Sequence, residues 1–376
     1  MFKRLFITIM ALAAIQNLSS QNYELQKYTY PTPYSVEKLN TPKGKKVKNV
    51  ILMIGDGMSL AHVQCAWTCN NGKLWLDNAM AVGLSKTPIA DQLIADSGSG
   101  GTAMAIGHTT KYHSVGVDSL GTPQKSLIDV AHDKGLKTGV AVTCRLWDAT
   151  PCDFLAHHVD RDQEQNLVGQ FPKSPVDYVF GGGASMFKPE NRDDKRDIFN
   201  ELKDEGYNIV YGYDDFLKYQ GGKAWCVPFE HDTPLPSQRK DMLAKAAMKE
   251  ISLLSANKKG FFMMIEGSQL DDYGHSNEIG LLMEETLDFD RTVGEVFKWA
   301  AKDGETLVVV TADHETGGLV LLGGDKNTGS VEVKFTTNQH SGVMVPVYAF
   351  GPKAENFTGF MLQRDIFWKI KNILGL

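Results

Sequence analysis

Apolar residues in this chain gather in short runs that do not alternate with polar residues. Residues 49–54, 138–143, 178–180, 261–265, 307–311 and 345–350 are runs of this kind, each of strand length. A strand with one face in water alternates, so continuous runs predict strands covered on both faces, as in a parallel sheet. Pro346, in the last run, lacks an amide donor and favours an edge position or the start of a strand.

Segments between these runs carry apolar residues at helical spacing. Thr122-Pro123 predicts a helix start with Gly135 at its end, and Pro236 predicts the start of a helix with one apolar face. A long helix is predicted over residues 281–302. Strands that alternate with helices predict an α/β fold, with a single large domain and a mostly parallel central sheet flanked by helices on both faces. We find no internal repeat.

Residues 95–103, with the sequence ADSGSGGTA, differ from the rest of the chain in their small side chains. An acid and a serine at the start of this run predict a helix N-terminus at Asp96 and Ser97, where unpaired amides suit a phosphate. Glycine costs about 1 kcal/mol against alanine in a helix, so the three glycines indicate that something approaches this backbone closely. Asp96 is also an ordinary N-cap residue, and the segment alone does not make Ser97 a nucleophile.

Acidic residues fall at the ends of three predicted strands, at Asp56, Glu266 and Asp313. The carboxyl ends of parallel strands meet at one edge of a sheet, where such proteins bind their ligands. Three carboxylates brought together there repel one another unless cations hold them. Asp56 and Glu266 with Thr150 form an all-oxygen set of the kind that suits magnesium.

Histidines accompany these acids at spacings typical of metal ligands. Asp271 and His275 are four residues apart and face the same side of a helical turn, while Asp313 and His314 are adjacent. His340 lies just before the last predicted strand. Each histidine alone is more often structural than a ligand, but mixed histidine and carboxylate sets suit zinc.

The composition is that of an ordinary globular protein with ample core: 376 residues, 42% hydrophobic, 22% charged and a net charge of -6. This mild acidity argues against a nucleic-acid partner, which normally needs a basic face. The five cysteines contain no Cys-x-x-Cys pattern. In an exported protein such cysteines can form disulfides, the odd number leaves at least one unpaired, and the sequence alone does not determine any pairing.

The N-terminus predicts export. Residues 1–20 combine Lys3 and Arg4 with a short apolar run and a polar exit, the pattern of a secretory signal peptide. We expect an exported protein, periplasmic first, with secretion or surface retention as alternatives. Residues 21–48 predict an N-terminal arm, and no later apolar run approaches the roughly 20 residues that a transmembrane helix needs.

Taken together, these segments resemble the alkaline phosphatases, in the order of that family and over residues 49 to 352. The matching pieces are Ile54-Gly55-Asp56-Gly57-Met58, Asp96-Ser97, Asp148-Ala149-Thr150-Pro151, residues 266–275, Thr311-Ala312-Asp313-His314 and His340. Most of the single pieces are weak signals, but the combined set is highly specific. The resemblance implies that residues 49–376 form an alkaline phosphatase-like catalytic domain.

The resemblance implies a phosphoric monoester hydrolase that acts through a phosphoserine intermediate, with two zinc ions and one magnesium ion. Ser97 would be the nucleophile, and Arg161 would grip the phosphate. The first zinc would be held by Asp271, His275 and His340, the second by Asp313, His314 and Asp56, and the magnesium by Asp56, Thr150 and Glu266. Asp148 would lie just outside the metal ligands. Without the spacing match, a surface ion pair with Asp160 or Asp162 would be the simpler interpretation of Arg161.

Two departures from the family pattern bear on this hypothesis. Asp272, next to the phosphate by its position, stands where relatives often carry Lys, His or Trp. The segment over residues 318–340 is short, which indicates a reduced crown insertion and a monomer or weak homodimer. The alternatives are a phosphodiesterase of the same superfamily and a non-catalytic exported phosphate-binding protein. Small phosphate monoesters are the expected substrates.

Overall fold

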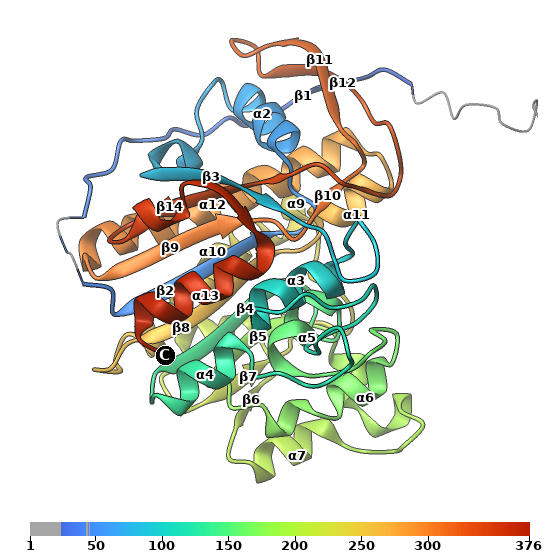
Figure 1. Cartoon of the computed structure of the whole chain (residues 1–376), viewed down its shortest axis with the longest axis vertical. Helices are drawn as coiled ribbons and strands as arrows, with labels where there is room; N and C mark the ends of the chain where they lie inside the picture. Colours follow the sequence, from blue (N-terminus) through green and yellow to red (C-terminus); the bar gives the residue numbers. More distant parts are fainter. Residues whose placement is uncertain (1–23, 43, 45) are drawn as a thin grey trace, which may run out of the picture.

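A ten-stranded sheet forms the centre of the computed structural model, which describes residues 24–42, 44 and 46–376 (Figure 1). In spatial order the strands are β15 (Gly359–Leu362), β3 (Ala81–Lys86), β14 (Val345–Phe350), β9 (Thr306–Thr311), β2 (Asn49–Gly55), β8 (Phe261–Gly267), β4 (Lys137–Arg145), β5 (Tyr178–Gly182), β7 (Ala224–Cys226) and β6 (Asn208–Val210). All neighbours pair in parallel except β14, which is antiparallel to both β3 and β9. The predicted α/β fold with a mostly parallel sheet is confirmed.

Helices cover both faces of the sheet. One face carries α3 (Ser97–Ile106), α4 (Leu127–Asp133), α5 (Ala149–Leu155), α6 (Glu164–Val168), α7 (Ile198–Asp204) and α13 (Gln363–Leu374). The other carries α2 (Leu60–Cys69), α8 (Tyr213–Lys218), α10 (Met242–Leu254) and α12 (Ile279–Asp303), with α9 (Pro236–Arg239) and α11 (Leu270–His275) leading into α10 and α12. Short 3₁₀ turns cover Trp75–Asn78, Phe171–Lys173, Ala184–Phe187, Pro189–Asn191 and Ala354–Phe357.

This double cover explains the uninterrupted apolar runs. Along β2, Val50, Leu52 and Ile54 join the core of one face, while Ile51 and Met53 join the core of the other. All five side chains are fully buried. A polar residue at any of these positions would have to lose its hydration without a partner, so alternation is not tolerated here.

The strand that contains Pro346 is not at an edge. β14 lies between β3 and β9, so the edge alternative for this strand is wrong, while the strand-start alternative holds because Pro346 is its second residue. Pairing with β9 involves only Tyr348, Ala349 and Phe350. The missing amide of Pro346 therefore falls outside that ladder, and its carbonyl accepts a bond from the Thr311 hydroxyl at 2.9 Å.

Two predicted helices differ from the structure at their starts. α4 begins at Leu127, not at Pro123, because the hydroxyl of Ser126 caps it, whereas Pro123 forms an isolated bridge with Val117. The helix predicted from Pro236 breaks at Lys240, whose φ of 54° is left-handed, and this break separates α9 from α10.

Two smaller sheets lie beside the large one. β1 (Gln26–Thr29) pairs with β12 (Ser330–Lys334), and β12 pairs with β11 (Val320–Asp325), so the short segment after residue 318 is largely one hairpin. β10 (Glu315–Thr316) pairs with β13 (His340–Ser341). The predicted arm packs on the same domain, since the Tyr34 hydroxyl donates to Asp290 of α12 at 2.5 Å.

The last helix packs against α3 (Figure 1). The Trp368 indole donates to the carbonyl of Gly107, the C-cap of α3, at 2.9 Å. The Gln363 amide donates to the Ala312 carbonyl at 2.8 Å, directly before Asp313. α13 therefore holds both α3 and the segment that follows β9.

The pairing that the sequence left open is answered by the structure, in which all five cysteines are free and buried. Within the described part of the chain, no helix has the length and apolar character needed to cross a bilayer. The signal peptide expected at residues 1–20 lies outside the described residues.

Candidate active site

The acids predicted at the strand ends come together at one edge of the sheet. β2 lies between β8 and β9, with Ile54 in register with Glu266 and with Thr311. The amide of Asp56 donates to Gly267 at 3.0 Å, which fixes the turn after β2 against the end of β8. Asp56, Glu266 and Asp313 are all buried. The site is thus built where the carboxyl ends of three adjacent parallel strands meet.

Asp271, His275 and His340 form one group of possible ligands, called the outer cluster below. The two histidines face each other with their Nε2 atoms 3.0 Å apart, and Asp271 lies 3.2 Å from His275 Nε2 and 3.5 Å from His340 Nε2. Their Nδ1 atoms contact the carbonyls of Asn338 at 2.7 Å and Ala95 at 2.8 Å. A carbonyl only accepts, so each Nδ1 carries the proton and both Nε2 atoms present lone pairs. Two lone pairs and a carboxylate at these distances fit a cation.

A second group, called the inner cluster, consists of Asp56, Asp313 and His314, all buried. His314 Nε2 lies 3.6 Å from Asp56 and 3.2 Å from Asp313. One carboxylate oxygen of each aspartate is buried without a hydrogen-bond partner. Burial, together with the charges of Asp313, Asp271 and Glu266, raises the pKa of Asp56 well above its usual range. Unpaired buried oxygens among like charges fit a cation-binding site.

The predicted all-oxygen set lies on the Glu266 side of the inner cluster. Thr150 is in the first turn of α5, which Asp148 caps, and its hydroxyl is buried without a hydrogen-bond partner. Burial, then the charges of Asp148 and Asp313, raises the pKa of Glu266 well above its usual range. Both observations fit a hard cation bound by oxygens.

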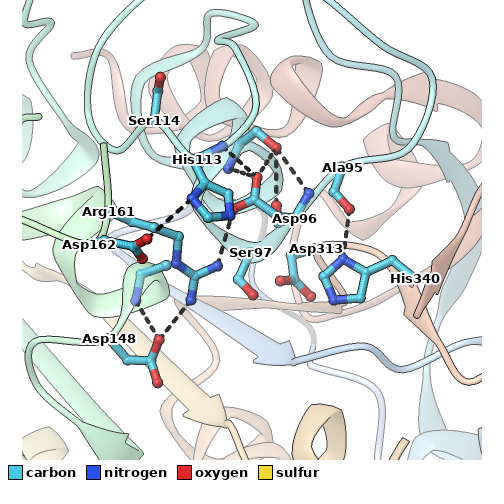
Figure 2. Close-up of polar contacts among 12 residues, drawn as sticks. Ala95, Asp96, Ser97, His113, Ser114, Asp148, Arg161, Asp162, Asp313 and His340 are labelled. Carbon is cyan, nitrogen blue, oxygen red and sulfur yellow. Dashed lines mark hydrogen bonds and ion pairs between the residues drawn. The ribbon is translucent and has the colours of Figure 1, made fainter. Parts of the chain in front are cut away.

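Ser97 begins α3, and its side chain lies beside Asp313 of the inner cluster (Figure 2). Its hydroxyl is 3.3 Å from Nε2 of His314 in the same cluster. Asp96 caps the helix by accepting from the Ser99 amide at 3.2 Å and from its hydroxyl at 2.6 Å. The capping interpretation of Asp96 is therefore confirmed, and the role of Ser97 as a nucleophile stays a prediction.

The glycines of α3 are needed by the protein's own packing. A Cβ on Gly100 would lie 2.6 Å from the carbonyl oxygen of Asp313, and one on Gly101 would lie 2.1 Å from a carboxylate oxygen of Asp153. Because these two positions lack a side chain, α3 can lie this close to Asp313 of the inner cluster and to Asp153 of α5. The close approach expected from the sequence is thus made by the chain itself.

Arg161 reaches back to this segment from the loop after α5. Its guanidinium donates to Asp96 at 3.1 Å and to Asp148 at 2.8 Å, and only 22% of the side chain is exposed (Figure 2). Its backbone amide also donates to the His113 carbonyl at 2.7 Å. Burial alone would raise the pKa of Asp96, but Arg161 and Ser99 outweigh it and hold this pKa below its usual value. The alternative of a surface ion pair with Asp160 or Asp162 is wrong.

Sequence reasoning missed a second guanidinium at Asp148. Arg145 donates to the other oxygen of Asp148 at 3.0 Å, lies 3.2 Å from Asp232, and stacks on the ring of Trp147 at 4.5 Å. Asp148 therefore joins two arginines. The sequence offered one signal for Arg145, which lies two residues after the strand predicted over residues 138–143 and three residues before Asp148.

Asp272 follows the outer cluster and is exposed. Partial enclosure by the surrounding chain and the charges of Asp271 and Asp148 raise the pKa of Asp272 to about 7, while Arg145 opposes the rise. No contact of its side chain with Ser97 or Arg161 is seen.

With this geometry established, comparison with known proteins identifies the family. A family model for alkaline phosphatase matches residues 47–334, well over half of the chain. The chain belongs to the alkaline phosphatase family. It is therefore an enzyme of the phosphatase class, and this family depends on metal ions.

Two curated relatives and two solved structures each match 88% or more of this chain. Alkaline phosphatase 4 of Bacillus subtilis (strain 168) is 29% identical over 97% of this chain and 96% of its own length. Alkaline phosphatase of Escherichia coli (strain K12) is 26% identical over 88% of this chain and 87% of its own. Among solved structures, alkaline phosphatase from the Antarctic bacterium TAB5 superposes with a TM-score of 0.84 at 35% identity, covering 88% of this chain and 99% of that one. A histidine-to-aspartate variant of the TAB5 enzyme, with Mg bound in its M3 site, has a TM-score of 0.83 at 33% identity and covers 89% and 99%.

Proposed function

We propose that this alkaline phosphatase hydrolyses small phosphate monoesters by forming a phosphoserine at Ser97. The observation that carries the proposal is the position of the Ser97 hydroxyl, 3.3 Å from His314 in the inner cluster and at the start of α3. A free serine is a weak nucleophile at neutral pH, so a cation next to its oxygen is the activation this site offers.

The ligand types support two zinc ions and one magnesium ion. The outer cluster and the inner cluster each combine histidine with carboxylate, which suits zinc, whereas Asp56, Thr150 and Glu266 offer only oxygen, which suits magnesium. When bound, these ions stabilise negative charge on the serine oxygen and the leaving oxygen and lower the pKa of water. The Mg-bound M3 site of the TAB5 variant supports the magnesium assignment.

The remaining residues orient the phosphate. Arg161 is held by Asp96 and Asp148, so its planar fork is fixed before substrate arrives and can bind two phosphate oxygens. The positive end of α3 adds to this attraction. The Ser97 oxygen gives its proton to solvent and attacks phosphorus, the bond between phosphorus and the ester oxygen breaks, and the leaving oxygen takes a proton from water. A water molecule then attacks the phosphoserine, the bond from phosphorus to Ser97 breaks, and inorganic phosphate and the serine hydroxyl are formed. Asp148 acts through Arg161 and lies beside the oxygen set.

Turnover of p-nitrophenyl phosphate with and without EDTA tests the proposal. We expect turnover that EDTA abolishes and that zinc with magnesium restores, and elemental analysis should find about two zinc ions and one magnesium ion per chain. Phosphate binding without turnover would instead establish the non-catalytic alternative. Faster turnover of bis-p-nitrophenyl phosphate than of the monoester would establish the diesterase alternative.

We also propose that the protein is exported and is a monomer or a weak dimer. Export rests on residues 1–20 and is tested by cell fractionation and N-terminal sequencing of the mature protein. The weak association rests on the short segment after Gly318, because obligate dimers usually bury at least roughly 2,000 Å². Sedimentation at micromolar concentration should show a monomer fraction, and a tight dimer at nanomolar concentration would contradict this proposal.

A further inference from the structure

A single hydroxyl lies between the two ligand clusters. Thr316, on β10, is fully buried, and its hydroxyl hydrogen-bonds to Asp271 of the outer cluster. The same oxygen lies 3.2 Å from Nδ1 of His314 in the inner cluster. Thr316 is therefore in contact with one ligand from each cluster.

The directions of these two hydrogen bonds follow from the groups involved. A carboxylate only accepts, so the one proton of the Thr316 hydroxyl goes to Asp271. Toward His314 the hydroxyl must then accept, which requires the proton of the imidazole to be on Nδ1. This leaves the lone pair on Nε2, the atom that faces Ser97 and Asp313.

We propose that Thr316 is a positioning residue that fixes the ligating nitrogen of His314 and couples its orientation to that of Asp271. The inference rests on the proposed metal-dependent function. Ligating histidines commonly donate their second N–H to a carboxylate or carbonyl, which fixes the ring. Here a hydroxyl relays that donation from His314 to a carboxylate of the other cluster.

The surrounding backbone holds Thr316 in this place. Its amide donates to the Gly57 carbonyl at 3.1 Å, and β10 pairs it with His340 of the outer cluster. Gly57 has a φ of 71°, and a Cβ there would lie 2.6 Å from the Thr316 hydroxyl and 3.1 Å from Asp271. Because Gly57 has no side chain, the Thr316 hydroxyl can occupy the space next to it.

Replacement of Thr316 by valine keeps the shape of the side chain and removes the hydroxyl. The buried N–H of His314 and one oxygen of Asp271 would then lose their partner at the same time. Removal of such a supporting group typically costs 10- to 100-fold in metal affinity. We expect both zinc ions to be bound about 10- to 100-fold more weakly, because one residue serves both clusters.

The experiment is competition for zinc between a chromophoric chelator and the full-length protein, compared among wild type, Thr316→Val and Thr316→Ser. The serine variant keeps the hydroxyl and should stay within about threefold of wild type. Thr292→Val is a matched control, because Thr292 is fully buried in α12 and its hydroxyl bonds only within that helix, to Asp288 at 3.0 Å. Thermal unfolding of each metal-free protein measures structural damage separately.

Weakened zinc binding in Thr316→Val, with Thr316→Ser and Thr292→Val near wild type, supports the inference. Equal zinc affinity in wild type and Thr316→Val overturns it, and so does a loss of affinity for only one of the two ions. If the valine variant does not fold, Thr316→Ala removes the hydroxyl without adding bulk next to Gly57. Its zinc affinity relative to wild type then supports or overturns the inference by the same criteria. A wild-type protein that binds no zinc would overturn the proposed metal site itself, which is a different outcome.

Discussion

Replacement of Arg161 by lysine tests the phosphate site most directly, because it keeps the charge and removes the fork. The arginine spans two carboxylates, Asp96 at 3.1 Å and Asp148 at 2.8 Å, with 22% of the side chain exposed. One ammonium cannot contact both carboxylates and two phosphate oxygens in that geometry. Loss of one charge-assisted hydrogen bond costs about 1.5–3 kcal/mol. At 1.4 kcal/mol per tenfold, this is a loss of roughly 12- to 140-fold in kcat/KM.

The assay is kcat/KM for p-nitrophenyl phosphate, with zinc and magnesium content measured on the same preparations. Arg196→Lys is the matched control, because Arg196 pairs with Glu201 at 2.5 Å at the start of α7 and makes no contact with the site residues. This control should stay within about twofold of wild type, since a partly exposed ion pair contributes little. A loss of less than threefold in Arg161→Lys, with full metal content, would refute the role given to the fork.

Three further predictions address the nucleophile, the mouth of the site and the N-terminal arm. Ser97→Ala should abolish phosphoenzyme formation and keep normal metal content. Wild-type rates in this variant would contradict the assignment of Ser97 as the nucleophile. Weak residual turnover would not contradict it, because water near bound metal ions can still attack. The Asp272→Lys variant should bind inorganic phosphate more tightly and turn over more slowly, because the substitution replaces repulsion of the phosphate dianion by attraction. An unchanged inhibition constant for inorganic phosphate would mean that this exposed side chain faces away from the phosphate. Burial raises the pKa of Asp290 to about 6, so the folded state keeps this proton to higher pH than the unfolded state does, and its contribution to stability is present at low pH and lost as pH rises through 6. Urea unfolding of wild type against Asp290→Asn should show this loss as roughly 2 kcal/mol between pH 4 and pH 7, and a difference independent of pH would refute it.

Much of the fold could be predicted because its signals are local. A run such as Val50 to Ile54 is apolar throughout, and only a strand with two packed faces requires that. The internal position of β14 could not be predicted in the same way. It is possible because the pairing of β14 with β9 begins at Tyr348, beyond Pro346, and the sequence does not show where that pairing begins. The start of α4 at Leu127 was missed because a capping serine outweighed a proline that merely tolerates a helix start.

Strand ends and helical spacing pointed to the acids and to the pair Asp271 and His275, whereas the division into two zinc sets, with His340 in the first, came from the resemblance to the alkaline phosphatases. The carboxylate partners of Arg161 are 65 and 13 residues away, and no local pattern predicts such pairs. Thr316 was missed for a related reason: only the fold brings Asp271 and Gly57 next to it, from distant parts of the chain. Three-dimensional structure was needed for each contact that joins one loop of the site to another.

The packing of α13 on α3 has a consequence for biosynthesis. Gly107 and Trp368 are 261 residues apart, and synthesis proceeds from the N-terminus, so the helix that carries Ser97 leaves the ribosome long before its last partner exists. The Gln363 bond to Ala312 likewise forms only after residue 363 has been synthesised. A nascent chain that has not yet reached α13 therefore contains Ser97 on a helix that lacks this packing partner.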